Sequence, residues 1–324
     1  MERVMRIKGK AEIDVFTVGR VYIDIQYFVD NLPGPNKAGE ILEIYQGCGG
    51  CPGNVAVAAA RLGLKTAVCA MVGSDEFGEM YINRLKSENV DASCVSRDDV
   101  KPTGMSVIML DRRGTPAIVR RLGANTELYF DDVDTDLVEK AKWLHMAAAS
   151  NISVPEETSA VAKEAGLVTS FDPGRSMSRL GYGKLKKIWD NTDVVIVNRE
   201  EAGNIVGVTY DGSNFDEVSE KLIAAIGEDR LYVIKGGSEP VYGRSQEEEF
   251  FLRPFKVEVV DTLGAGDAFD AGVIAGLIWG KSLRESIDYG NAVAALKIMK
   301  KGTQSVPYKE DMENFLKRED IGRV

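Results

Sequence analysis

The sequence predicts an α/β fold in which helices cover both faces of a mainly parallel sheet, with a small additional β-sheet. Three observations favour this class. Short β-rich runs alternate with helical segments along the 324 residues, two pairs of strand-like runs each flank a turn, and a glycine-rich turn joins a late strand to an apolar helix. No internal repeat and no linker rich in Pro, Gly and Ser divides the chain, so we expect one domain over residues 1–324.

The alternating runs define the main sheet. Small apolar and β-branched residues favour buried strands over residues 14–19, 66–72, 142–147, 167–171, 194–197 and 232–234. Helical composition or periodicity is present over residues 55–62, 76–85 and 268–279. Strands that alternate with helices build βαβ units, in which the strands are parallel and both faces of the sheet are covered.

Two further pairs of strand-like runs do not fit this alternation. Residues 21–28 and 40–45 flank a turn at 32–36, and residues 104–110 and 117–122 flank a turn at 111–114. We expect both hairpins to form a small β-sheet lid, inserted at about 20–46 and 101–124, over the carboxyl edge of the main sheet, where open α/β sheets bind ligands. Because a lid sheet exposes an edge strand, we also expect a homodimer through the lid.

Charge excludes some partners and directs attention to the glycines. Forty Lys and Arg against fifty Asp and Glu give a net charge of −10, which repels nucleic acid. An anionic ligand must therefore be held by backbone dipoles and a few placed cations. No apolar run approaches the roughly 18 residues of a membrane span, and the N-terminus lacks the apolar segment of a secretory signal, so we expect no membrane partner and a cytoplasmic protein.

Histidine and cysteine are too few for common metal mechanisms. His145 is the single histidine of the chain, which excludes zinc sites that need two. Cys48 and Cys51 form one CxxC, but Cys69 and Cys94 lack the spacing of the second pair of a zinc ribbon. The CxxC pair is either a set of small residues in a tight loop or a local disulfide.

The strongest chemical signal is the run from Asp261 to Asp267 (DTLGAGD), which lies between a β-rich run and the apolar helix. Gly264 and Gly266 tolerate positive φ angles and lack a Cβ, so a ligand can approach their backbone closely. The free N–H groups of the first helical turn then form an anion site at the positive end of the helix dipole. Asp267 is either a capping carboxylate or a base that takes a proton from an alcohol attacking a bound phosphate.

Two motifs carry a resemblance to a known family. Residues 261–272 (DTLGAGDAFDAG) resemble the signature DTxGAGDxFxxG of the ribokinase-like PfkB family of sugar and nucleoside kinases. Residues 49–63 (GGCPGNVAVAAARLG) match a second motif of that family, GGxxxNxAxxxxRLG. The two motifs lie about 200 residues apart in the family's order, so coincidence is improbable. The resemblance covers residues 14–307 and implies a ribokinase-like three-layer α/β/α fold with a β-sheet lid.

The resemblance implies a catalytic role for the start of the apolar helix. Asp267 matches the family's catalytic base, which deprotonates the acceptor hydroxyl. The backbone N–H groups of Gly264, Ala265 and Gly266 match the anion hole that steadies the γ-phosphate of ATP during transfer. The implied reaction therefore needs ATP and Mg²⁺, and its one essential side-chain charge is a carboxylate.

The resemblance also places the sugar site in the N-terminal third of the chain. Asp24 follows the first strand in the family's GxxxxD pattern, which begins at Gly19, and matches a carboxylate that receives sugar hydroxyls. Gly49, Gly50 and Asn54 match the loop and the amide that bind the same sugar. Carboxylates and amides suit a polyol because each makes two hydrogen bonds in a fixed geometry.

A nucleotide site and two ion sites follow from the same resemblance. The implied nucleotide-binding residues are Asn198, Lys235, Gly237 and Asn291. Glu201 completes an NxxE element with Asn198 and would organise Mg²⁺ through water. Many members hold a monovalent cation, K⁺, with backbone carbonyls beside the anion hole, in the stretch that begins at Asp261. Pro240 stands where the family usually has a second glycine, so only Gly237 of that turn is carried over.

Arginines near the expected sugar site raise the question of an anionic acceptor. This chain has Gly174 for the asparagine of the family's DPNxR run, and Arg175 lies one place early. The guanidinium of Arg175 is long enough to reach phosphate from this shifted position. The pairs Arg112–Arg113 and Arg120–Arg121 lie on the second hairpin, where neighbours point to opposite faces and at most one of each pair faces the site. Such a cation favours an acidic or phosphorylated sugar, and surface solvation is its alternative role.

We expect ATP-dependent phosphorylation of a hydroxyl on a small sugar. Asp24 and Asn54 are compatible with ribose, a ketohexose, 2-keto-3-deoxygluconate, myo-inositol or a nucleoside. A nucleoside kinase of the same family and a sensor that kept the fold without the chemistry are the alternatives. A Rossmann dehydrogenase does not fit, because Pro52 replaces the third glycine of GxGxxG, and no Walker GxxxxGK[ST] run is present.

Overall fold

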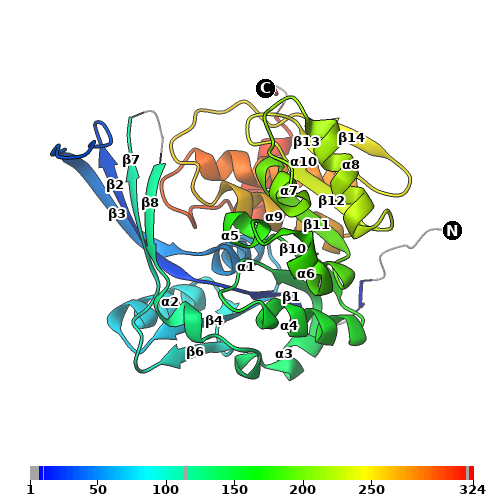
Figure 1. Ribbon diagram of the computed structural model, residues 1–324, viewed down its shortest axis with the longest axis horizontal. Helices are drawn as coiled ribbons and strands as arrows, with labels where there is room; N and C mark the ends of the chain where they lie inside the picture. The colour runs from blue at the N-terminus through cyan, green and yellow to red at the C-terminus, as the bar shows by residue number, and fades with distance from the viewer. Residues whose placement is uncertain (1–6, 10, 113–115, 319–320) are drawn as a thin grey trace.

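The computed structural model describes the chain except for residues 1–6, 10, 113–115 and 319–320 (Figure 1). Its main sheet has ten strands among the described residues, in the order β14-β13-β12-β11-β10-β9-β1-β4-β5, with β6 also paired to β4. The parallel strands are β1 (Ile13–Val18), β4 (Thr66–Gly73), β5 (Val90–Asp91), β6 (Val95–Asp98), β9 (Ala141–Met146), β10 (Val168–Phe171), β11 (Val194–Asn198) and β12 (Leu231–Lys235). The predicted α/β class is confirmed.

One edge of the main sheet is antiparallel. β13 (Val241–Arg244) and β14 (Glu249–Leu252) follow β12 as a hairpin-like extension. The sequence interpretation did not include these two strands, because glycine and charged residues interrupt their short apolar runs (VYGR and EFFL). They extend the sheet away from the small sheet (Figure 1).

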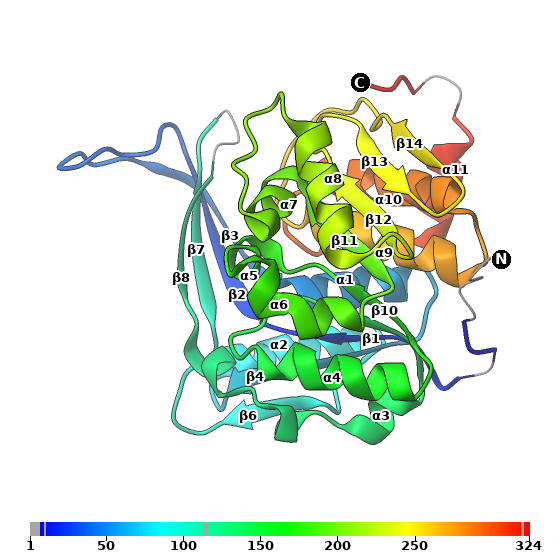
Figure 2. The same cartoon turned by 45° about the vertical axis from the view of Figure 1, so that its right-hand side comes forward.

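Helices cover both faces of the main sheet (Figure 2). One layer contains α1 (Cys51–Arg61), α2 (Glu76–Ser87), α9 (Ala265–Ile278), α10 (Leu283–Ile298) and α11 (Lys309–Leu316). The other contains α3 (Thr135–Glu139), α4 (Ser153–Glu164), α5 (Gly174–Ser178), α6 (Gly181–Asp190), α7 (Arg199–Val206) and α8 (Phe215–Ile226), with the short 3₁₀ turns η1 (Gly123–Glu127) and η2 (Phe130–Asp132). None of the helices in the described part of the chain has the length and hydropathy that crossing a bilayer requires.

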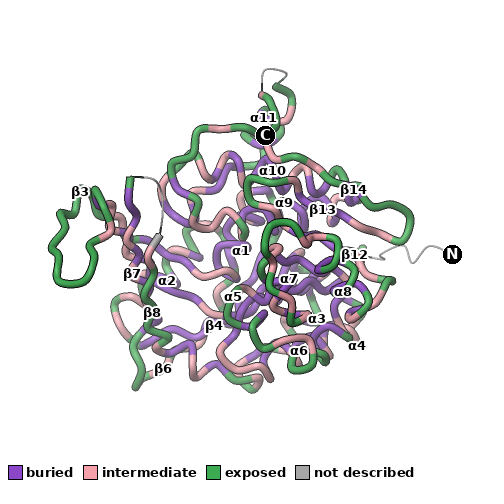
Figure 3. The backbone as a smooth tube through the Cα atoms, turned by 45° about the horizontal axis from the view of Figure 1, so that its top comes forward, coloured by how far each residue is buried: buried purple, intermediate pink, exposed green. Residues whose placement is uncertain are grey.

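Alternating strand residues supply the two cores. On β1, Val15 packs in the layer of α1 and α9, whereas Phe16 packs in the layer of α4 and α6. Their parallel neighbours on β9, Trp143 and Leu144, divide in the same way. Strands buried on both faces explain the nearly continuous apolar runs of the sequence. Figure 3 shows this buried centre and the exposed outer part of β3.

A four-stranded small sheet lies beside the carboxyl edge of the main sheet, with the order β3-β2-β7-β8. Its strands are β2 (Tyr22–Val29), β3 (Ile41–Gly49), β7 (Met105–Leu110) and β8 (Pro116–Arg121). The β2–β3 and β7–β8 pairs are antiparallel, as the two predicted hairpins require, and β2 joins β7 in parallel. Part of the turn predicted at 111–114 falls outside the described residues.

β3 extends to Gly49, four residues beyond the run predicted from composition. Pairing with β2 continues through Asp24 with Gly47 and Tyr22 with Gly49. Glycine weakens strand propensity but is favoured where another group approaches the backbone. A Cβ on Gly49 would lie 1.8 Å from the Asp24 carboxylate, so the bare backbone is what allows Asp24 to lie against it.

The helix that follows the glycine-rich turn is buried on all sides. α9 packs between α1 and α10, which explains why its sequence is apolar without a polar stripe. At the α10 contact, a Cβ on Gly272 would lie 2.7 Å from the Cα of Gly290. The start of α9 is therefore fixed at the carboxyl edge of the main sheet, next to the small sheet.

Candidate active site

The candidate site lies where the carboxyl ends of the parallel strands meet the first turns of α1, α7 and α9 (Figure 1). Two hydrogen-bonded groups of polar side chains define it. Asn54 of α1 contacts Asp267 of α9, and Lys235 at the end of β12 contacts Asp172 and Asp270. Open α/β sheets bind their ligands at this edge.

The glycine-rich turn places helix amides toward the site. Gly264 caps α9 with a left-handed φ of 77°, a conformation that glycine adopts without strain. The Ala265 N–H donates to the Thr262 carbonyl at 3.1 Å, so this amide is already engaged. Within the described chain, the N–H groups of Gly266 and Asp267 have no protein acceptor. These two groups are the free donors that the first turn offers to an anion.

Asp267 projects from the same helical turn. Its Oδ2 accepts a hydrogen bond from Asn54 Nδ2 at 2.7 Å. Burial raises the pKa of the Asp267 carboxyl, while the hydrogen bonds from Asn54 and from the Cys51 thiol oppose that rise. A carboxylate with a raised pKa, held next to free amides, is suited to accept a proton close to a bound phosphate.

Asp24 lies on the inner face of the small sheet and is only 5% exposed. Burial raises its pKa to about 7, while hydrogen bonds with Ser106 and Thr303 and the charge of Arg120 oppose that rise. The charge of Asp267 raises the pKa further, which places the two carboxyls in the same site. Motif matching missed Ser106 and Thr303. Ser106 is the cross-strand partner of Asp24 on β7, and Thr303 lies in the segment after α10.

The glycine motif after β3 shapes the same region. Gly50 caps α1 with a φ of 94°, and the Tyr81 hydroxyl donates to the Gly49 carbonyl at 3.0 Å. Asn54 lies in the first turn of α1, where its Oδ1 is buried and has no partner within the described chain. The structure thus brings together all four residues that the resemblance implies for the sugar, with Asn54 also bonded to Asp267.

Lys235 forms a charged cluster with two buried carboxylates. The cluster lies beneath residues 264–267, which we call the anion turn. Its Nζ lies 2.7 Å from Asp172 Oδ2 and 3.0 Å from Asp270 Oδ1. A Cβ on Gly266 would lie 3.5 Å from the same Nζ, so the ammonium sits just below the free amides. Burial opposes ionisation of Lys235, but the two carboxylates outweigh it and hold the pKa well above its usual range. Sequence reasoning missed Asp172 and Asp270, because only the fold brings them to Lys235.

Asn198 and Glu201 form a reciprocal cap on α7. Asn198 Oδ1 accepts from the Glu201 N–H, and Glu201 Oε2 accepts from the Asn198 N–H, both at 2.9 Å. Burial raises the pKa of Glu201 to about 7, and the charge of Asp172 adds to the rise while that of Lys235 opposes it. Glu201 is therefore both a helix cap, as its position in the first turn indicates, and a neighbour of the Lys235 cluster.

The residues present fit Mg²⁺ held through water rather than directly. In the described ranges, no group of three or more carboxylate, thiol or imidazole side chains is arranged around an ion position. Mg²⁺ keeps several waters and takes the remaining ligands from phosphates. Glu201 keeps one carboxylate oxygen outside its cap, beside Asp172, which suits contact with a hydrated ion.

The K⁺ site expected at Asp261 does not fit the structure. The Asp261 carbonyl accepts a hydrogen bond from Lys297 Nζ at 2.8 Å. Its Oδ1 accepts from the Leu263 N–H at 2.9 Å, and its Oδ2 accepts from the Gly302 N–H at 2.8 Å. Each Asp261 oxygen therefore already has a hydrogen-bond partner, and the partner of its carbonyl is an ammonium group.

Other residues named from the sequence lie outside these contacts. Gly237 adopts a φ of 67° in the exposed turn after β12, and Asn291 is buried in α10 with its Nδ2 lacking a partner in the described chain. Arg175 is exposed and pairs with Glu200 rather than with the candidate anion site. His145 is a core residue of β9 whose Nδ1 lies 2.9 Å from Ser170 Oγ, and burial lowers its pKa to about 4.

The cysteines are all free thiols in the structure. Cys48 is buried in β3, and Cys51 begins α1 with its thiol bonded to Asp267. The two therefore belong to different elements, and Cys51 is a site residue that the CxxC interpretation did not identify. Burial raises the pKa of Cys51 well above its usual value, so the thiol stays protonated.

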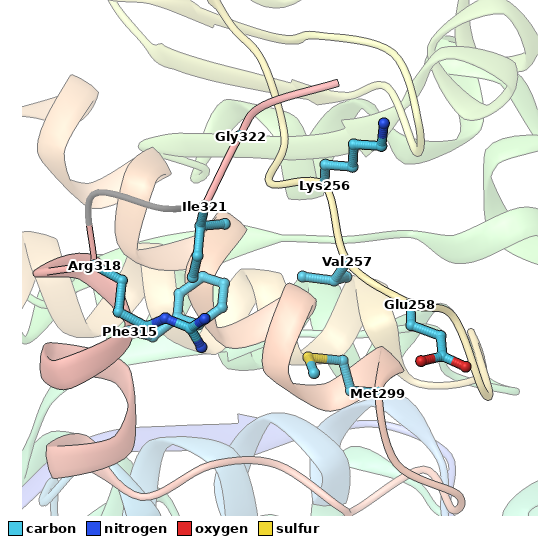
Figure 4. Close-up of a pocket in the computed structure, with 8 residues that line it drawn as sticks. All are labelled: Lys256, Val257, Glu258, Met299, Phe315, Arg318, Ile321 and Gly322. Carbon is cyan, nitrogen blue, oxygen red and sulfur yellow. The ribbon is translucent and has the colours of Figure 1, made fainter.

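A separate pocket of about 490 Å³ lies between the segment 256–258 and the C-terminal residues Phe315 and Ile321 (Figure 4). Val257, Met299, Phe315 and Ile321 supply its apolar lining, and Lys256, Glu258 and Arg318 supply charged groups. None of the polar residues of the candidate site lines it. The pocket is therefore distinct from the site at the start of α9.

A carboxylate and free helix amides at the carboxyl edge of a parallel sheet form a site of the phosphotransferase class. Residues 12–310 match the pfkB family of carbohydrate kinases. The chain is 29% identical over 309 residues to the ATP-dependent ribose-1-phosphate kinase of Halopiger xanaduensis, covering 94% of this chain and 98% of that enzyme. It is 30% identical over 300 residues to the ribokinase of Haemophilus influenzae, covering 91% and 94%.

A solved structure agrees with this assignment. The ribokinase of Arabidopsis thaliana complexed with ribose and ATP has a TM-score of 0.82 at 24% identity, covering 94% of this chain and 99% of that one. The chain therefore belongs to the PfkB family of carbohydrate kinases, and its fold is that of the ribokinases.

The raised pKa of Asp24 predicts a pH-dependent stability. The folded protein holds the Asp24 proton more tightly than the unfolded chain, because the pKa rises from 3.8 to about 7. The contribution of this group to the unfolding free energy therefore falls as pH rises from about 4 to about 7, by up to about 4 kcal/mol. Asn does not ionise, so Asp24→Asn removes the fall in unfolding free energy that ionisation causes. The variant should therefore stabilise the protein at pH 8 and much less at pH 4.

Denaturant unfolding at the two pH values measures the difference. An equal change in unfolding free energy at pH 4 and pH 8 would contradict the assignment of a titrating buried carboxyl. The exposed Asp136→Asn variant serves as the control and should shift neither value.

Proposed function

We propose that the protein transfers the γ-phosphoryl group of ATP to a hydroxyl of a small sugar-like molecule bound between Asp24 and Asp267. The observation that carries the proposal is the first turn of α9. The same turn presents a half-buried carboxylate, Asp267, and N–H groups at Gly266 and Asp267 that have no protein acceptor among the described residues. A base beside an anion site is what attack by an alcohol on phosphorus requires.

The residues act on three parts of the reaction. Asp24 and Asn54 hold the sugar, and Asp267 accepts the proton of the attacking hydroxyl as its oxygen bonds to phosphorus. The free amides of Gly266 and Asp267 face the transferring phosphoryl group, and Gly264 and Ala265 shape the turn that presents them. Lys235 lies just below these amides and adds positive charge, although it is shared with Asp172 and Asp270.

Mg²⁺ supplies charge neutralisation on the nucleotide phosphates when it is bound. Asn198 and Glu201 would hold the hydrated ion, and Gly237 and Asn291 border the region proposed for the nucleotide. The small sheet acts as the lid inserted at about 20–46 and 101–124 in a single domain. Closing it excludes water, so that transfer to the sugar outcompetes hydrolysis.

The identity of the acceptor is supported only in part. The name of the Halopiger relative makes a phosphorylated pentose one candidate, and that of the Haemophilus relative makes a neutral pentose another. A nucleoside kinase of the same family and a sensor without catalysis are the alternatives. ADP release measured with a panel of sugars, sugar phosphates and nucleosides separates all four.

The small sheet also supports the proposal of a homodimer. Ile41, Leu42 and Ile44 of β3 are 50%, 50% and 60% exposed. Apolar side chains gathered on an edge strand favour a partner that covers them. A second copy of the chain, paired through the lid, would do so with a closed twofold interface.

Replacing the proposed base tests the function directly. Asp267→Asn keeps the shape and the hydrogen bond with Asn54 but accepts no proton, so kcat should fall by at least about 10²-fold while ATP affinity changes little. Steady-state ADP release and nucleotide titration measure the two quantities. Asp136→Asn, which alters a first-turn carboxylate of the remote helix α3, is the matched control. Turnover near that of the wild type in the Asp267 variant would refute the assigned role.

A further inference from the structure

A row of paired residues crosses the inner face of the small sheet. Asp24 of β2 is paired with Ser106 of β7, and Ser106 is paired with Arg120 of β8. Cross-strand partners project from the same face of a sheet. Because Asp24 lies in the site, Arg120 projects to the site side, and Arg121 projects to the opposite face.

A second arginine reaches the same region from the main sheet. Arg20 follows β1, and its Nη2 donates to Ser176 Oγ in α5. The Arg120 guanidinium carbon lies 5.8 Å from the centre of the Tyr22 ring. Burial raises the pKa of the Tyr22 phenol, and the charges of Arg20 and Arg120 both oppose that rise. Two guanidinium groups thus converge on Tyr22, two residues from Asp24.

In the described part of the chain, no carboxylate lies within ion-pair distance of Arg20 or of the exposed Arg120, although the charge of Arg120 acts on Asp24. Among the ion pairs of the described residues, carboxylates pair with Arg61, Arg112 and Arg175, but none pairs with Arg20 or Arg120. The Nε of Arg20 is buried and has no hydrogen-bond partner. In a chain with a net charge of −10, two such groups at the acceptor end of the site indicate an anion supplied by the ligand.

Resting on the proposed kinase function, we propose that the acceptor is a sugar that already carries a phosphate monoester, bound by Arg20 and Arg120. An anionic acceptor would otherwise be repelled by Asp24, by Asp267 and by the phosphates of ATP. The reaction forms a bond between a sugar hydroxyl oxygen and the γ-phosphorus and breaks the bond from that phosphorus to the β-phosphate oxygen. The hydroxyl proton passes to Asp267, and the products are ADP and a sugar bisphosphate.

Matched acceptor pairs test this proposal. Wild-type kcat/KM, from ADP release, should be at least about tenfold higher for a pentose phosphate than for the same pentose, as hydrogen bonds to a charged group typically contribute. Arg120→Gln should raise the KM for the pentose phosphate at least about tenfold and leave the KM for the pentose unchanged. Arg121→Gln, its neighbour on the opposite face, should change neither.

Equal or better use of the neutral pentose overturns the proposal while leaving the kinase function intact, and so does a sugar acid that outperforms the phosphate. An Arg120 variant that affects both acceptors alike also overturns it. If no neutral or anionic acceptor stimulates ADP release, the proposed function itself fails.

A buried lysine lies behind the anion turn and supports a second inference. Lys297 of α10 is completely buried, and its Nζ donates to the Asp261 carbonyl at 2.8 Å and lies 3.7 Å from Asp261 Oδ2. The Asp261 carboxylate binds the N–H groups of Leu263 and Gly302. The ammonium therefore joins α10 to the turn that leads into the first turn of α9.

Burying an ammonium costs several kcal/mol of desolvation free energy unless its hydrogen bonds and a nearby opposite charge offset that cost. Here the charge lies where the K⁺ expected from the family would bind the Asp261 carbonyl. We infer that Lys297 is a built-in cation, a positioning residue that holds the anion turn, so that catalysis needs no K⁺. The ligand set at Asp261 then belongs to the protein alone.

Activity in buffers of different cations tests this inference. Wild-type kcat should differ less than about twofold between K⁺, Na⁺ and tetramethylammonium salts at equal ionic strength. Lys297→Met, which replaces the aliphatic part of the side chain but removes the ammonium, should lower kcat at least about tenfold with partial rescue by K⁺ or ammonium, as loss of a buried charge's hydrogen bond predicts. Tenfold activation of the wild type by K⁺, or a Met variant with normal kcat and no cation response, overturns the inference. If the variant does not fold, the wild-type comparison alone decides.

Discussion

The site depends on how firmly the first turn of α9 is held. Gly264 packs so tightly that a Cβ there would lie 2.6 Å from the Thr303 carbonyl. Asp261 binds the backbone on both sides of it, at Leu263 and Gly302, and α9 itself is enclosed by α1 and α10. The helix amides therefore have one orientation, and Asp267 in the same turn has a fixed direction. Preorganised dipoles of this kind need no reorganisation when charge develops on a phosphoryl group.

Local charges allow an acidic protein to bind anions. The net charge of −10 opposes phosphate ligands at long range, but the site contains cations at short range. Lys235 lies beneath the anion turn, Lys297 behind it, and Arg20 and Arg120 at the sugar end. The paired carboxylates Asp172 and Asp270 keep Lys235 charged despite its burial. The surface can then remain acidic without loss of affinity inside the site.

Much of the fold could be predicted because periodicity is a local property. The alternating strands and helices and both hairpins follow from runs of about three to twelve residues. Pairing of β2 with β7 could not, since it joins two segments about 80 residues apart in the sequence that carry no mutual signal. The short strands β13 and β14 were missed for a local reason, because glycine and charged residues interrupt their apolar runs.

The residues of the site also fall into two groups, those that sequence motifs predicted and those that only the tertiary fold revealed. Asp24, Gly49, Asn54 and Asp267 were found because motifs record them, and the structure brings them together. Ser106, Thr303, Asp172, Asp270 and Lys297 act through partners that only the tertiary fold supplies. The phosphate contact suggested for Arg175 stays a prediction, since the exposed side chain lies beside Glu200 and outside the contacts described above.

Transfer of label from [γ-³²P]ATP tests the central claim most directly. If the first turn of α9 and Asp267 direct the phosphoryl group to an alcohol, a sugar or sugar phosphate acceptor becomes labelled in proportion to the ADP formed, and little inorganic phosphate appears. Label that appears only as inorganic phosphate, or ADP formation that no acceptor changes, would contradict the account.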